Sequence, residues 1–241
     1  MKLSGIRPKP TKSGSGSLMP LFHKLNIFIH ISFGTIALVI GFIALLNQGR
    51  PRRHIRYGRY FLYLLCVVVG TALIGSLLFR STPFLFMLTL LSGYGGYSGF
   101  RIIQRRESPA TFADLLIAGG VLVAGILFLM YAQQSDKNWS PAVIYPTLSA
   151  LVLLTGYDLI KHVWLFRPLK TWWLYEHIYK MCSAYNAILS AFTGTVLPQF
   201  KPYSQILPTV LCLVIIAYFI RKRVLARKRP APQTLPTTSM E

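Results

Sequence analysis

His54 and His177 are the residues of this sequence whose type and position best suit chemistry. Each lies at or just before the start of a long apolar segment, and both are expected near the same end of their helices. Haem iron takes two axial ligands from opposite faces, and histidines of neighbouring helices can provide them. The sequence therefore predicts that His54 and His177 are the metal ligands of one b-type haem.

Two further histidines are secondary candidates for cofactor binding. His162 is a reserve ligand, and Asp158 stands four residues before it on one helix face, where a carboxylate can fix the imidazole tautomer. His30 lies one turn into the first apolar segment and is expected near the opposite end. Its only neighbour there, His23, belongs to the same helix and cannot ligate the iron from the opposite face. We therefore expect at most one haem.

Charged residues accompany these histidines near the predicted helix ends. Glu176 and Lys180 stand four residues apart on one helix face. The residues predicted to meet the haem propionates are Arg56, Arg59 and Lys180. The candidate supporting carboxylates are Asp114, Asp158 and Glu176. An ionisable group at membrane depth is costly and is usually functional. The alternative for each group is a purely interfacial position, because water and lipid headgroups reach helix ends.

The composition defines the class of protein that must position these side chains. The chain has 241 residues, of which 53% are hydrophobic and 13% are charged, whereas about 25% of a soluble domain is charged. This excludes an ordinary soluble enzyme, a disordered chain and a coiled coil. The three cysteines lie in apolar runs without a CxxC pair, so neither a disulfide framework nor a cysteine metal cluster is expected.

Seven apolar segments are long enough to cross a bilayer as helices. They are predicted at residues 26–47, 59–79, 83–103, 111–131, 141–166, 173–197 and 203–220. The fold class is therefore an all-α polytopic transmembrane helical bundle of about seven spans. We expect a flexible basic tail over residues 1–20, a single transmembrane domain over residues 21–222, and a basic, proline-rich tail over residues 223–241.

The basic residues predict how the bundle is oriented. The chain has 26 Lys and Arg against 6 Asp and Glu, and clusters of them follow the first, third, fifth and seventh segments. The positive-inside rule then places the C-terminus in the cytoplasm and the N-terminus outside, although the basic N-terminal tail argues for the reverse. We expect a multi-pass protein of a bacterial inner (plasma) membrane that contacts the lipid bilayer, with anionic headgroups at its basic loops. Nucleic acid is not an expected partner, because no basic folded domain is present.

Small residues predict where helices approach closely. Gly95 and Gly99 form a GxxxG pattern, which lets two helix backbones pack tightly in lipid. Packing within one chain is the favoured interpretation. The alternatives are a homodimer formed through this helix and a glycine-lined cofactor slot.

Two short motifs carry a resemblance to a known family. They are HIRYGRY at His54–Tyr60 and EHIYKM at Glu176–Met181. With His30 in the first segment, they resemble an uncharacterised bacterial multi-span membrane family, domain of unknown function 2306. The resemblance implies a multi-span fold and carries no established activity. The histidine layout is also similar, more loosely, to di-haem b561-type and ferric-reductase-like cytochromes.

Three functions are open at this point. The leading hypothesis is a haem-b-binding membrane redox protein. The second is a transporter or permease for a small solute or for protons, although a transporter needs its charges near the midplane and most of these lie near an end. The third is a non-catalytic membrane assembly or lipid-interacting protein. Whether the chain is an enzyme stays open.

Overall fold

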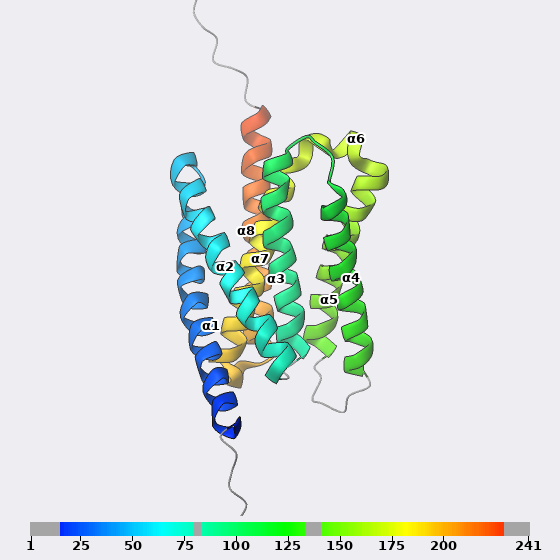
Figure 1. The fold of residues 1–241 in the computed structure, drawn as a ribbon. Coiled ribbons are helices and arrows are strands. Elements are labelled where there is room, and N and C mark those ends of the chain that lie inside the picture. Colours follow the sequence, from blue (N-terminus) through cyan, green and yellow to red (C-terminus); the bar gives the residue numbers. More distant parts are fainter. Residues whose placement is uncertain (1–14, 80–82, 134–140, 229–241) are drawn as a thin grey trace, which may run out of the picture.

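A computed structural model describes residues 15–79, 83–133 and 141–228 of the protein. These residues form a bundle of long helices. Figure 1 shows the helices running alternately up and down, so that the described chain starts and ends at opposite ends of the bundle. The long helices are α1 (Ser15–Leu46), α2 (Pro51–Phe79), α3 (Pro83–Arg105), α4 (Phe112–Gln133), α5 (Pro141–Ile160), α7 (Trp173–Val196) and α8 (Tyr203–Lys228). The described residues contain no strand, which confirms the all-α prediction.

Short irregular helical segments connect α5 to α7 and α7 to α8. A π-helix at Lys161–Leu165 follows α5 directly, and it leads through α6 (Phe166–Leu169) and a 3₁₀ turn at Lys170–Trp172 into α7. A second 3₁₀ turn at Pro198–Phe200 precedes α8. The predicted span over residues 141–166 therefore covers α5, the π-helix and the first residue of α6.

Five stretches of the described helices are long and apolar enough to cross a membrane. They are Met19–Leu46, Pro51–Phe79, Phe112–Tyr131, Ile144–Val196 and Tyr203–Leu225. The prediction of about seven spans is slightly higher than this number. The long stretch Ile144–Val196 contains both α5 and α7, and α3 is less apolar because of its glycine, serine and tyrosine residues.

Two predicted boundaries shift in the structure. α1 begins at Ser15, so the helix takes in the last residues of the predicted N-terminal tail, and residues 1–14 of that tail lie outside the described part. α8 continues to Lys228, so the C-terminal tail predicted from residue 223 is helical over its first six residues. Residues 229–241 also lie outside the described part.

α3 and α7 form the centre of the bundle. α3 contacts α2, α4, α5 and α7, while α1 pairs with α2, α4 with α5, and α8 with α7. Three clusters of buried apolar side chains hold these described helices together, and α7 contributes to all of them through Ala187, Ala184 with Ile188, and Cys182. This arrangement places any polar residue of α3 or α7 among several helices.

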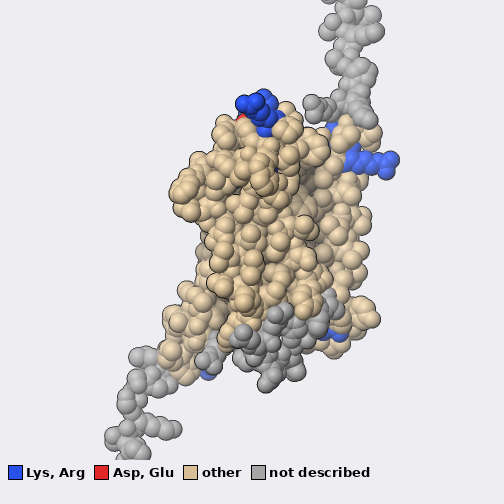
Figure 2. All heavy atoms as spheres, turned by 90° about the vertical axis from the view of Figure 1, so that its right-hand side faces the viewer, with Lys and Arg blue, Asp and Glu red and all other residues tan. Residues whose placement is uncertain are grey.

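The outer face of the bundle is apolar over a broad band. Figure 2 shows this band on the face turned to the viewer, with coloured charged residues only at its ends. Large apolar side chains such as Leu116, Leu127 and Leu153 are 59 to 67% exposed. A surface of this kind is stable in contact with lipid, which fits an integral membrane protein.

The predicted GxxxG face is used within the chain. A Cβ atom at Gly95 would lie 3.2 Å from the Lys180 carbonyl oxygen, and one at Gly99 would lie 2.9 Å from Met181 Sδ. α7 therefore covers this face of α3. The favoured interpretation, packing within one chain, is what the structure shows at these two glycines. A homodimer through this helix stays a prediction.

The close approach of α3 to α7 leads to a test. Gly95→Leu forces a side chain against rigid backbone and is expected to destabilise the bundle by about 1–3 kcal/mol. Gly120→Leu is the matched control, because a Cβ at Gly120 would meet nothing within 4 Å. Thermal unfolding in detergent should show a lower midpoint for Gly95→Leu alone. Equal midpoints for the two variants would contradict the packing described here.

Candidate functional site

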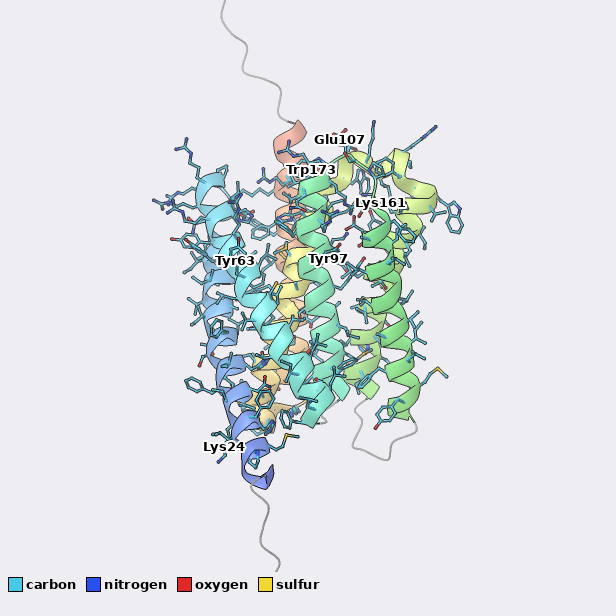
Figure 3. All side chains as sticks on the ribbon, viewed as in Figure 1. Lys24, Tyr63, Tyr97, Glu107, Lys161 and Trp173 are labelled. Atoms are coloured by element: carbon cyan, nitrogen blue, oxygen red, sulfur yellow. The ribbon has the colours of Figure 1, made fainter. Side chains whose placement is uncertain are left out.

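Most of the predicted site residues gather near one end of the bundle. This is the end at which α1 turns into α2 and at which α7 begins. Figure 3 shows Tyr97, Glu107, Lys161 and Trp173 in this half of the molecule, while Lys24 lies at the other end. The residues form two neighbouring groups: a histidine pair between α2 and α7, and an ion-pair cluster among α3, α4, α5 and α7.

The histidine pair consists of His54 and His177. Their ring centres lie 6.3 Å apart, and the ring planes are at 87° to each other. An imidazole nitrogen binds a transition metal at about 2 Å, so two imidazoles on opposite sides of one iron have ring centres roughly 6 Å apart. The spacing of the two rings therefore fits a single metal held between them.

Backbone carbonyls fix the tautomer of both histidines. His54 Nδ1 lies 2.9 Å from the carbonyl oxygen of Ala44 on α1, and His177 Nδ1 lies 2.9 Å from that of Gly99 on α3. Because a carbonyl only accepts, each Nδ1–H donates and each Nε2 keeps its lone pair. Neither Nε2 has a hydrogen-bond partner within the described residues. This is the arrangement that metal-binding histidines commonly show.

Two glycines lie near this pair. Gly58 lies one turn after His54 on α2, and a Cβ there would meet no atom within 4 Å. Gly99 lets α3 come close enough to α7 for its carbonyl to reach His177. Open space therefore borders α2 at Gly58, one turn from His54.

His30 does not belong to this pair. Its Nδ1 lies 3.0 Å from Thr71 Oγ1 and 3.2 Å from the carbonyl oxygen of Val68. Ala44, which contacts His54, is about 21 Å further along α1. His30 thus lies apart from the histidine pair, and its place among the cofactor-binding residues stays a prediction.

The charged residues of α7, Glu176 and Lys180, are buried and form two ion pairs. Asp158 accepts hydrogen bonds from Lys180 Nζ at 2.6 Å and from Tyr94 Oη at 2.6 Å. Glu176 accepts hydrogen bonds from Lys161 Nζ and from Tyr157 Oη. The Lys180 side chain is only 1% exposed and its partner is Asp158. Its predicted contact with haem propionates was therefore wrong.

The other predicted propionate partners lie on the surface. Arg56 and Arg59 are exposed on α2, within the two turns that follow His54. Both stay predictions, since the structure pairs neither with a described carboxylate. The predicted ion pair between Glu176 and Lys180 is present but long, with 4.0 Å between Oε2 and Nζ.

Asp114 links α3 to the start of α4. It forms a capping box with Thr111, whose backbone N–H donates to Asp114 Oδ2 at 2.9 Å while Thr111 Oγ1 accepts from the Asp114 N–H at 3.4 Å. Tyr97 Oη and the forked guanidinium of Arg101 also donate to the carboxylate. Asp114 therefore fixes α4 against α3 and is saturated with donors.

His162 lies in the π-helix, where regular spacing is lost. Asp158 does not contact it and instead pairs with Tyr94 and Lys180. The prediction that Asp158 fixes the His162 tautomer was wrong, because the wider turn at Lys161–Leu165 changes the direction of the side chains after Ile160. His162 lies beside the ion-pair cluster rather than beside His54.

Sequence reasoning missed several residues of the cluster. It gave no partner for Asp114, although the Thr-x-x-Asp pattern at Thr111 is a recognisable capping signal. The roles of Arg101, Lys161 and Tyr157 depend on contacts between helices, and no spacing along the chain signals them.

Comparison with models of known families, with curated proteins and with solved structures gave no match. The resemblance to domain of unknown function 2306 and to b561-type cytochromes therefore stays a prediction.

The buried pair of Lys180 and Asp158 provides a stability test. Lys180→Met leaves the Asp158 carboxylate without its cation, and it is expected to lower the free energy of unfolding by about 3–5 kcal/mol. Adding Asp158→Asn removes the unpaired charge and should restore most of the loss. Lys24→Met, an exposed control at the other end, should change nothing. Unfolding in detergent measures all four proteins, and a stable Lys180→Met single variant would refute the pairing.

Proposed function

We propose that this integral membrane protein binds one b-type haem between His54 and His177 and transfers electrons through it. The observation that carries the proposal is the pair of imidazoles at 6.3 Å, each with its Nδ1 on a backbone carbonyl. A haem held in this way supplies reversible one-electron chemistry. Whether an enzymatic reaction is coupled to it stays open.

Different residues of the chain bind and orient such a group. His54 and His177 provide the two nitrogen ligands from α2 and α7. Ala44 and Gly99 orient the imidazoles through their carbonyls and raise the basicity of the ligating nitrogens. Arg56 and Arg59 stand at the same end and are the proposed partners of the propionates.

One haem near one end does not by itself carry an electron across the bilayer. At the other end His30 contacts Thr71 and the Val68 carbonyl. The ring of His23 lies 4.1 Å from that of Phe79, with the planes tilted by 45°. These two imidazoles belong to one helix and do not face each other. The protein therefore fits an exchange of electrons with partners on the histidine-pair side.

Absorbance spectra of the purified protein test the haem. Protein made in haem-replete cells should show a Soret band that shifts on reduction with dithionite. His54→Ala and His177→Ala should each abolish it, because each removes an axial ligand. His30→Ala and His162→Ala are matched controls and should keep the band. A colourless wild-type preparation, or bands that survive both ligand substitutions, would refute the proposal.

We also propose that the histidine-pair end faces the cytoplasm of a bacterial inner membrane. Basic residues concentrate there, at the α1–α2 turn, the end of α3 and the end of α8, and such residues stay on the inner side. They would also contact anionic lipid headgroups at that surface.

Reporter fusions test this orientation. A fluorescent or enzymatic reporter that works only in the cytoplasm should be active when fused after Glu241. A periplasmic reporter at the same position should be silent. The reverse pattern would place the histidine pair on the outer side.

A further inference from the structure

The ion-pair cluster encloses a small cavity beside the histidine pair. Helices α3, α4, α5, α6 and α7 line it together with the π-helix after α5. Its volume is about 30 Å³, which is room for the polar head of a small molecule and not for a large ligand. It extends to Ser108 in the exposed α3–α4 connection, so it can be reached from this end of the bundle.

The charged network around this cavity has one more cation than carboxylates. Arg101, Arg105 and Lys161 line the cavity with Asp114, Asp158 and Glu176. Lys180, which does not line it, adds the fourth cation by pairing with Asp158. Lys161 and Lys180 have their own carboxylates, and Arg101 takes Asp114. Arg105 is therefore the cation left over.

Arg105 cannot gain a hydrogen bond from Asp114. That carboxylate already accepts from Tyr97, Arg101 and Thr111. The distance from Arg105 Nε to Asp114 Oδ2 is 3.7 Å, which is too long for a hydrogen bond. Arg105 Nε is nonetheless buried and has no hydrogen-bond partner in the described residues.

Three more buried polar atoms at this cavity have no hydrogen-bond partner in the described residues. Eight buried side-chain atoms lack a hydrogen-bond partner in the described part of the chain, and four of them belong to residues that line this cavity. Besides Arg105 Nε, they are Ser98 Oγ, His162 Nδ1 and Glu176 Oε2. Ser98 and Glu176 are only 4% and 7% exposed. Leaving such an atom unpaired costs about 1–3 kcal/mol, so four in one cavity call for a polar occupant, either water or a ligand.

These atoms also specify what the ligand must offer. Arg105 and Ser98 can donate hydrogen bonds, and the surplus charge calls for one negative charge. The Glu176 oxygen is an acceptor and calls for a donor on the same ligand. A carboxylate with a neighbouring hydroxyl group meets both needs, whereas a sulfate dianion exceeds the available charge and has no donor for Glu176.

We propose that this cavity binds the head of a small 2-hydroxycarboxylate, with the carboxylate at Arg105 and Ser98 and the hydroxyl group at Glu176. The site uses residues that the histidine pair does not, so it does not depend on the proposed haem. α7 connects the two sites, since Glu176 lines the cavity and His177 is the next residue.

Calorimetric titration of the full chain in detergent with glycolate tests this site. Glycolate should bind the wild type. Acetate should bind at least about tenfold more weakly, because it leaves Glu176 without a donor. Sulfate should also bind more weakly than glycolate, because it has no donor for Glu176. No heat with glycolate, or tighter binding of sulfate, would overturn the assignment.

Variants locate the binding. Arg105→Met should weaken glycolate binding at least about tenfold, while Arg223→Met, an exposed arginine of α8, should leave it unchanged. Ser98→Ala removes one buried oxygen and should weaken binding severalfold even if Arg105→Met folds poorly. His54→Ala should still bind glycolate, which separates this site from the haem. Equal affinity in Arg105→Met, Ser98→Ala and the wild type would refute the site.

Discussion

A buried charge needs a partner of opposite charge, and the structure of this end of the bundle depends on that constraint. The Lys180 side chain is almost completely buried, and inside a helical bundle surrounded by lipid no water solvates its charge. Asp158 supplies the countercharge from α5, and Tyr94 of α3 supplies a second donor to that carboxylate. The same requirement joins Lys161 to Glu176 and Arg101 to Asp114. These contacts join α7 to α5 and to the π-helix, and they join α3 to α4 and α5.

α7 serves two sites because successive helix residues point about 100° apart. Glu176 and Lys180 lie one turn from each other and face the ion-pair cluster. His177 and Met181 repeat that spacing on the adjacent side, where His177 meets His54 and Met181 contacts Gly99. A change in the cluster would therefore act on the helix that also holds one of the paired imidazoles.

α3 connects the two groups from the other direction. Its glycines bring it against α7, and the carbonyl of Gly99 orients His177. The side chains of Tyr94, Tyr97 and Arg101 lie towards α4 and α5 and bind the carboxylates there. The small and polar residues that make α3 less apolar than its neighbours are thus the ones that a central helix of the bundle needs.

The sequence by itself determined the helices and their lipid-facing character, because apolar length and the backbone's need for internal hydrogen bonds leave few other folds. It also placed His54 and His177 at one level, since their distances from the helix ends are set by the chain. It could not pair Asp158 with Lys180 rather than His162, nor find the π-helix at Lys161–Leu165 that turns His162 aside. Those choices depend on which helices become neighbours and how they rotate, and only tertiary packing decides that.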